Sequence, residues 1–442
     1  MKRPVQDLVN LVEPASQRLI GLTVDEAHEL MRSEDPGALS DARGSFALVV
    51  RDGEKVYLAR SLDRPLRYFL AKQESGPLLV VAERIDQIRD WLDAQGFGDQ
   101  FQPTYSRMAP AHHVTRLRLL GCPDPNPVYA RFFDPPRGTM PADLDLIGRH
   151  YVQTLMATLE EWLAVQDSEE PIGVLFSGGI DSGSVLVGLH DLLLKRGESP
   201  ARLKAFTLAV DGGGSDLEQA RDFLRALDLE YLNEAVEVEA SELDPLAAVA
   251  LIEDYKPRDV ECATVNMALL ARLRRIYPNW RLLVDGDGGD ENLKDYPIEE
   301  NPELTIRSVV NNSMLYQEGW GVESIKHSLT YSGGYSRGCV RTYAPAQHHG
   351  FVGFSPYAQP AVIEAAEGIP FRELTSGSHK ALYRLKGDIV RRGMQQVMDR
   401  ELPVFPKRRF QEGATSPATF AALFSQDEGA YRRHFLGLHG AG

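Results

Sequence analysis

An apolar segment that runs into a glycine- and serine-rich loop and then into a helix is the feature that most constrains the fold of this chain. Residues 172–176 read Ile-Gly-Val-Leu-Phe, residues 177–182 read Ser-Gly-Gly-Ile-Asp-Ser, and residues 183–195 have helical periodicity. Strands and helices then alternate: strands are expected over 203–210, 231–238 and 281–285, and helices over 217–227 and 265–276. Such alternation predicts a parallel sheet covered by helices on both faces.

The first third of the chain has a different pattern, with short apolar segments that follow one another closely. Strands are expected over 45–50, 55–60, 67–71 and 77–82, and a helix over 84–94. Asp52-Gly53 lies between the first two strands and is a hairpin turn signal. This pattern predicts an antiparallel sheet with accompanying helices.

A segment rich in Pro, Gly and Asp, residues 121–142, separates the two patterns and predicts a linker. With 442 residues the chain is also too long for one compact core. We therefore predict an α/β protein with two domains, an antiparallel N-terminal domain over 1–135 and a parallel-sheet domain over 143–442. The second would open on a long helix over 144–165 and close in a mostly helical part.

Composition and charge exclude several classes of protein. The net charge of −15 disfavours nucleic acid as a partner, and no run of 18 apolar residues predicts a membrane span. The three cysteines are scattered, which disfavours a disulfide framework or a zinc site and favours the cytoplasm. Basic residues gather over 380–409, either as a solvated helix face or as a positive wall for a polyanion.

The loop over 177–182 has the chemistry of a phosphate site. Gly178 and Gly179 lack a Cβ, so the backbone can turn tightly and approach a phosphate. The following helix directs free N–H groups and its positive dipole end at an anion. Ser177 and Ser182 add hydroxyl donors, and Asp181 is a natural Mg²⁺ ligand because it would otherwise repel a phosphate.

A second glycine-rich loop follows the strand over 281–285. Residues 286–291 read Gly-Asp-Gly-Gly-Asp-Glu, so glycines alternate with carboxylates at a strand end. Such a loop can wrap a metal or present a base. Taken alone, it could also be a solvated acidic turn, which is the less favoured of the two interpretations.

Together the two loops identify a family resemblance. The first resembles the PP-motif of the ATP pyrophosphatases, which cleave ATP between the α and β phosphates. The pair resembles the synthetase domain of asparagine synthetases and of the β-lactam and carbapenam synthetases, a domain with the adenine nucleotide α-hydrolase-like fold. Further resemblance lies in residues 206–221, in Arg341 and Gly350, and in the segments 355–357 and 404–413, so that it covers roughly residues 143–415.

The resemblance implies ATP and Mg²⁺ as cofactors and gives individual residues a role. Residues implied in ATP binding are Phe176, Ser177, Gly178, Gly179, Asp181, Ser182, Leu208, Asp285 and Gly286. Asp181 and Asp290 would hold Mg²⁺, and Lys407 would reach the α-phosphate and the developing oxyanion. Asp287 stands where asparagine synthetases have Glu and β-lactam synthetases have Tyr, which favours carboxylate-assisted attack by ammonia or an amine.

The N-terminal part also resembles the family, in its glutamine-hydrolysing domain of the Ntn-hydrolase fold. The resemblance lies in residues 44–49, 61–68 and 79–83. That domain uses a cysteine directly after the initiator Met as its nucleophile, whereas position 2 here is Lys2. The first nucleotide motif also comes some tens of residues earlier than in full-length relatives. We therefore expect a truncated, degenerate domain that has lost glutamine hydrolysis.

The expected substrate pocket departs from that of asparagine synthetases. Residues 351–358 form an apolar segment where those enzymes carry a charged pair, and residues 257–264 differ from their aspartate-binding segment. Aspartate is therefore disfavoured as the substrate. The expected pocket residues are Arg341, His348, His349 and Tyr357, although the paired histidines could also serve packing.

The leading hypothesis is an ATP-dependent ligase that adenylates a small-molecule carboxylate for attack by ammonia or an amine, in specialised biosynthesis. An ammonia-dependent asparagine synthetase, a β-lactam synthetase-like intramolecular cyclase and a nucleotide-binding pseudoenzyme stay open as alternatives. A tRNA-modifying enzyme is disfavoured by the acidic charge and the lack of paired cysteines. Whether the chain forms a homodimer is left open.

Overall fold

A five-stranded parallel sheet forms the centre of the C-terminal part of the chain. The computed structural model describes residues 7–33, 35–74, 76–119, 127–295, 298, 305–311, 339–405, 410–425 and 427–440. The strand order is β13-β12-β11-β14-β15, and every neighbouring pair is parallel. The strands are β11 (Ile172–Leu175), β12 (Leu203–Val210), β13 (Asn233–Val238), β14 (Leu282–Val284) and β15 (Val352–Phe354). The predicted parallel sheet is confirmed.

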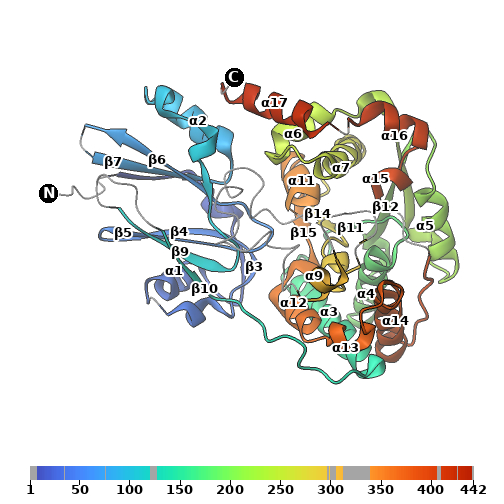
Figure 1. Ribbon diagram of the computed structural model, residues 1–442. Helices are drawn as coiled ribbons and strands as arrows, with labels where there is room; N and C mark the ends of the chain where they lie inside the picture. Colours follow the sequence, from blue (N-terminus) through green and yellow to red (C-terminus); the bar gives the residue numbers. More distant parts are fainter. Residues whose placement is uncertain are drawn as a thin grey trace.

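Helices cover both faces of this sheet (Figure 1). Those before residue 312 are α3 (Leu144–Ala164), α4 (Ile180–Lys195), α5 (Asp216–Arg225), α6 (Pro245–Ile252), α7 (Pro257–Ile276), α8 (Gly289–Asn292) and α9 (Ile306–Asn311). Those after residue 338 are a π-helix (Cys339–Tyr343), α11 (Ala344–His348), α12 (Pro360–Glu367), α13 (Phe371–Thr375), α14 (His379–Met398), α15 (Phe410–Gly413), α16 (Pro417–Leu423) and α17 (Glu428–Leu438). No helix among the described residues has both the length and the apolar character that a membrane crossing requires.

Helices α3 and α14 pack along each other and support the sheet from one side. The two backbones approach closely at a pair of glycines: a Cβ on Gly148 would lie 2.6 Å from the Ile389 carbonyl oxygen and 2.9 Å from the Gly393 amide nitrogen. Asp143 caps the start of α3 by accepting hydrogen bonds from two amide groups of its first turn. The close approach fixes α14 against the sheet and directs its apolar face toward the strand ends.

The N-terminal part consists of two stacked four-stranded sheets (Figure 1). One has the order β1-β7-β6-β8, with β1 (Asp7–Asn10), β7 (Gly76–Ala82), β6 (Arg67–Gln73) and β8 (Arg107–Met108). The other has the order β10-β9-β5-β4, with β10 (Val128–Arg131), β9 (His113–Arg118), β5 (Lys55–Arg60) and β4 (Ala47–Asp52). A small pair, β2 (Arg18–Ile20) and β3 (Arg43–Ser45), and the helices α1 (Val24–Arg32) and α2 (Ile85–Ala94) complete it.

Two details of the N-terminal part differ from the sequence prediction. All pairs are antiparallel except β1 and β7, which run parallel. Part of the predicted linker is also a strand, because β10 lies within 121–142 and pairs with β9. The sequence pattern did not predict β10 because it is an edge strand: four residues that pair on one side only have little apolar periodicity of their own. The domain limits 1–135 and 143–442 stay a prediction.

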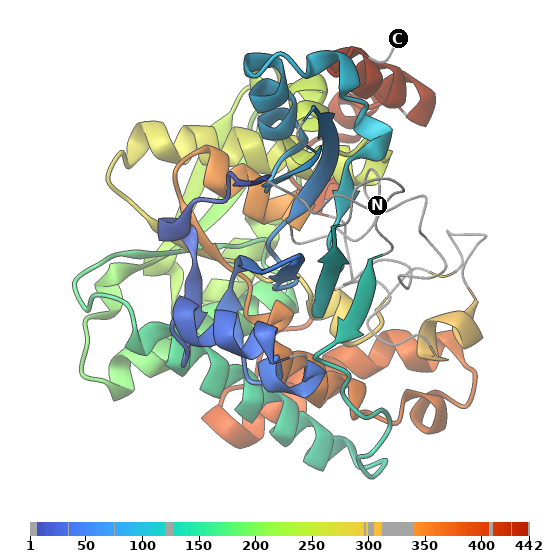
Figure 2. The same ribbon diagram turned by 90° about the vertical axis from the view of Figure 1, so that its left-hand side faces the viewer.

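The N-terminal sheets share a hydrophobic cluster with the C-terminal helices. Phe69 of β6 and Ile85 and Ile88 of α2 pack with Ile252 of α6 and Phe435 of α17, and all five side chains are buried. In both views α17 lies beside α2 (Figures 1 and 2). Apolar burial of this kind contributes about 25 cal/mol for each Å² removed from water, so the two parts stabilise each other.

Candidate functional site

The first glycine-rich loop links β11 to α4 at the carboxyl edge of the parallel sheet. Gly178 has a φ of +73°, and a Cβ there would lie 2.6 Å from the Ala220 amide nitrogen on α5. Only glycine fits this turn without displacing α5. Helix α4 begins at Ile180, inside the motif, so its free N–H groups face the loop. The position at a strand end and a helix start suits an anion.

The second glycine-rich loop packs directly on the first. A Cβ at Gly286 would lie 2.7 Å from the Ser182 amide nitrogen, so a side chain at this position would separate the loops. Tyr357 lies fully buried beneath both loops, and its hydroxyl donates to the Asp181 carbonyl oxygen over 3.2 Å. The close contact brings the carboxylates of the two loops to one place.

The ammonium group of Lys386 lies between the two carboxylates that the resemblance implies as metal ligands. It donates to Asp181 Oδ2 and to Asp290 Oδ1, and lies 3.7 Å from Asp295 Oδ2. Burial acts to lower the pKa of Lys386, but the three carboxylates outweigh it and raise the pKa well above its usual value. Lys386 is therefore a cation held at the junction of the loops.

The donor set at this junction fits a magnesium ion that is completed by phosphate oxygens. The described residues contain no group of three or more Asp, Glu, His or Cys side chains that could hold a metal by themselves. Mg²⁺ usually takes one or two protein carboxylates together with water and substrate phosphates. Asp181 and Asp290 already converge on a single cation, the Lys386 ammonium, which is the geometry that such a site requires.

In the second loop the buried carboxylate of Asp285 lies close to the half-buried Asp287. Asp285 accepts hydrogen bonds from the Asp287 amide over 3.0 Å and from the Ser355 hydroxyl over 2.9 Å. Burial and then the charge of Asp287 raise the pKa of Asp285 well above its usual value. Burial also raises the pKa of Asp287 to about 6, against the opposing effects of Arg341 and Thr342. A carboxylate with this pKa is suited to accept a proton near neutral pH.

The π-helix places polar side chains around Asp287. The Thr342 hydroxyl donates to Asp287 Oδ2, and the Arg341 guanidinium Nε lies 3.9 Å from Asp259 Oδ1 of α7. Asn266 of α7 donates its side-chain amide to the Arg341 carbonyl oxygen over 2.7 Å. Single-turn π-helices are rare and are often found at functional sites. Asp287, Arg341 and Thr342 thus form one polar cluster beside the nucleotide loops.

The structure brings most of the predicted site residues together and separates a few. The two loops carry Ser177, Gly178, Gly179, Asp181, Ser182, Asp285, Gly286, Asp287 and Asp290. Phe176 directly follows β11, Leu208 lies within β12, and both side chains are buried. His348 and His349 precede β15 and therefore lie at the opposite edge of the sheet, because Val352 pairs with Leu282 at the start of β14. Lys407 lies outside the described residues.

Among the side chains of the site that sequence reasoning missed, Lys386 left a signal in the sequence and Thr342 did not. Lys386 lies within the basic segment but was not distinguished from its neighbours. It shares a helical face with the apolar residues Leu382, Leu385 and Ile389, all of which are buried in α14. A lone lysine on an apolar stripe indicates a buried charge with a partner. Thr342 carried no such signal, because its contact with Asp287 joins two distant segments.

Comparison with known proteins agrees with this geometry. Residues 157–328 match the model of the family described as asparagine synthase. The matched segment includes both glycine-rich loops and four strands of the parallel sheet. A search of curated proteins found no match to the chain. Residues 157–328 are therefore an asparagine synthase-like domain, and its fold is the adenine nucleotide α-hydrolase-like fold.

Proposed function

We propose that this protein joins a small-molecule carboxylate to ammonia or an amine, using ATP to adenylate the carboxylate first. The asparagine synthase-like domain indicates an ATP-dependent, amide-forming ligase. The observation that carries the finer proposal is the junction of the two loops, where Asp181 and Asp290 converge on one cation with Asp287 close by in the same loop. A phosphate site beside a base is what adenylation followed by amine attack requires.

In the first half-reaction a substrate carboxylate oxygen attacks the α-phosphorus of ATP, and pyrophosphate leaves. The amides at the start of α4 and the hydroxyls of Ser177 and Ser182 would bind the phosphates. Asp181 and Asp290 would hold Mg²⁺, which neutralises phosphate charge when bound. Lys386 lies at the same junction and would donate to the departing pyrophosphate, whose negative charge grows as the bond breaks. We propose that Lys407 serves the α-phosphate.

In the second half-reaction the amine nitrogen attacks the acyl carbon of the adenylate, and AMP leaves. The attacking nitrogen must lose a proton, which Asp287 would accept. Arg341 and Thr342 lie beside Asp287 and would orient it and the incoming carboxylate substrate. We propose that the chain does not supply its own ammonia from glutamine, because its cysteines, Cys122, Cys262 and Cys339, all lie outside the segments that resemble the glutamine-hydrolysing domain.

The first experiment is a measurement of pyrophosphate release with Mg-ATP across a panel of amino-acid carboxylates, with and without ammonium and with glutamine as a control. We expect release with a narrow set of acids, dependence on ammonium or an amine, and indifference to glutamine. Release without any added amine would favour an intramolecular amine or adenylation alone, which mass spectrometry of the product separates. Bound ATP with no release from any carboxylate would instead favour a nucleotide-binding pseudoenzyme.

The amide-forming step is expected to slow as the pH falls through about 6. Burial raises the pKa of Asp287 to about 6, so this carboxylate is ionised above that pH and protonated below it. A general base acts only in its ionised form, so the rate should decline on the acidic side. The check is a single-turnover pH profile with preformed adenylate and a constant concentration of neutral amine. If Asp287→Asn retains the same acidic limb, another group is responsible.

A further inference from the structure

One short segment of the C-terminal part contacts both the proposed base and the N-terminal sheets. The segment 339–348 consists of the π-helix and α11, which follow each other without a break. Thr342 donates to Asp287, and Tyr343 and Gln347 face the other way, toward the N-terminal part. The segment is therefore placed to transmit the position of one part to the site of the other.

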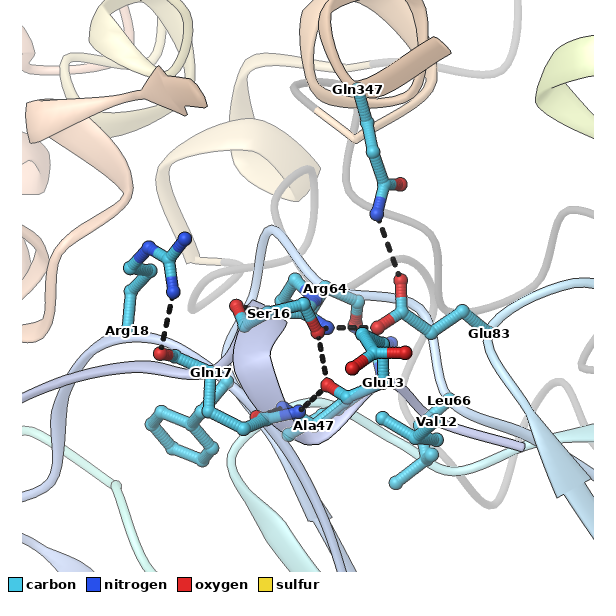
Figure 3. A network of polar contacts seen from close by, with 12 residues as sticks. Val12, Glu13, Ser16, Gln17, Arg18, Ala47, Arg64, Leu66, Glu83 and Gln347 are labelled. Atoms are coloured by element: carbon cyan, nitrogen blue, oxygen red, sulfur yellow. Dashed lines mark hydrogen bonds and ion pairs between the residues drawn. The ribbon is translucent and has the colours of Figure 1, made fainter. Parts of the chain in front are cut away.

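A buried ion pair in the N-terminal part meets this segment. Glu83, which follows β7, accepts from the Arg64 guanidinium through Oε1 and from the Gln347 side-chain amide over 3.4 Å through Oε2. Figure 3 shows Gln347 projecting from α11 toward Glu83, with Arg64 on the other side of the carboxylate. The Arg64 guanidinium also lies 5.8 Å from the ring centroid of Tyr343, within cation–π range.

The two side chains of the segment that contact the N-terminal part lie on one face of it. Tyr343 and Gln347 are four residues apart, so in a helical segment they lie on the same face. Glu83 and Arg64 are both buried, with 6% and 1% of their surface exposed. A buried pair with several partners has few alternative arrangements, which makes it a precise anchor for the segment.

A second buried ion pair lies before helix α7, which contacts Arg341 of the Asp287 cluster. Arg67 of β6 donates to Glu253 over 2.8 Å, and neither side chain is exposed to any extent. Glu253 ends α6, and the next residue, Asp254, accepts hydrogen bonds from the amides of residues 255 and 256 just before α7. Helix α7 carries Asp259 and Asn266, which contact Arg341.

We propose that Glu83 is a positioning residue for amide formation. It contacts Gln347 directly and Tyr343 by way of Arg64, and so holds the segment 339–348 in place. Thr342 and Arg341 of this segment then orient Asp287. This inference rests on the proposed function and assigns the N-terminal part a role in the second half-reaction. The shared hydrophobic cluster alone explains attachment of the two parts. It does not explain why polar contacts with the N-terminal part converge on a segment that also contacts Asp287.

The test compares two variants with a matched control. Gln347→Leu removes the hydrogen bond to Glu83 from an exposed position, and Glu83→Gln removes the charge that pairs with Arg64 while it keeps the side-chain shape. The control is Arg43→Met, which breaks another contact between the two parts, the 2.7 Å pair with Glu161 of α3, away from the segment. Thermal midpoints report whether each variant remains folded.

We expect both variants to lower kcat for amide formation by about 10- to 100-fold, because small misplacements of reacting groups have effects of this size. ATP–pyrophosphate exchange, which reports the first half-reaction, should stay within about twofold of wild type. Gln347→Lys, which keeps a donor for Glu83, should recover much of the rate. Equal effects in Gln347→Leu and Arg43→Met, or a parallel loss of exchange and amide formation, would overturn the proposal.

A second measurement does not depend on activity. Amide hydrogen exchange over residues 339–349 should become faster in Gln347→Leu and Glu83→Gln and stay unchanged in Arg43→Met. Unchanged exchange in all three variants would refute the anchoring role. If wild type released no pyrophosphate with any carboxylate, the proposed function would fail, while the exchange result would still decide whether Glu83 anchors the segment.

Discussion

Replacing Asp181 with alanine is expected to abolish pyrophosphate release. The Asp181 carboxylate lies at the start of α4, where it meets Asp290 from the second loop across the Lys386 ammonium. Without it, one of the two carboxylates proposed to hold Mg²⁺ is missing, and the phosphates of ATP lose their alignment for in-line attack. The measurement is pyrophosphate release with saturating Mg-ATP and the preferred carboxylate.

The fold of this variant should survive, because Lys386 keeps two carboxylate neighbours. Asp290 still accepts from its ammonium group, and Asp295 lies 3.7 Å away. Asp388→Ala is the matched control, since this half-exposed aspartate of α14 lies 3.7 Å from Arg391 and belongs to neither loop. Release at the wild-type rate in Asp181→Ala, with an unchanged Mg²⁺ dependence, would show that the nucleotide site has been assigned to the wrong loop.

Replacing Asp287 with asparagine is expected to separate the two half-reactions. The substitution keeps the side-chain volume and removes the proton acceptor, so amide formation should slow by about 10²- to 10⁴-fold. Adenylation uses the phosphate loop and should persist, which ATP–pyrophosphate exchange would report. The measurement is the single-turnover rate of product formation from preformed adenylate.

The asparagine variant should also remove an unfavourable charge beside the buried Asp285. Burial raises the pKa of both Asp285 and Asp287, so removal of one ionisable group leaves the fold at least as stable as before. A thermal midpoint at or above that of wild type would agree with this view. Loss of adenylation in parallel with amide formation would instead place Asp287 in nucleotide binding and remove it from the role of base.

Much of the fold could be predicted from the sequence because its signals are local. Strand β12 occupies the predicted range, and β11 and α3 each end one residue earlier than predicted. Helix α7 begins earlier than predicted, at Pro257, because its first turns are buried and polar residues there do not follow an amphipathic pattern. Strand β15 was not predicted, because its three residues lie in the apolar segment 351–358, which was interpreted as part of the substrate pocket.

The two glycine-rich loops could also be predicted from the sequence, for a physical reason. A backbone that must turn with positive φ against a neighbouring helix, as at Gly178, accepts only glycine, so the requirement appears directly as a residue type. At Gly286 the requirement is steric alone, because a Cβ there would lie 2.7 Å from the Ser182 amide nitrogen of the other loop. The sequence by itself therefore determined the sheet class, the positions of the two glycine-rich loops and the carboxylates that they carry.

Only the tertiary structure decided which side chains meet there. Lys386 reaches Asp181 across 205 residues of sequence, Thr342 reaches Asp287 across 55, and Gln347 reaches Glu83 across 264. No local pattern encodes such pairs, because a charged or polar side chain has the same propensities whether its partner is water or a distant residue. Packing of α14 on α3, and of the N-terminal sheets on α6 and α7, brings these groups into contact and so completes the candidate site.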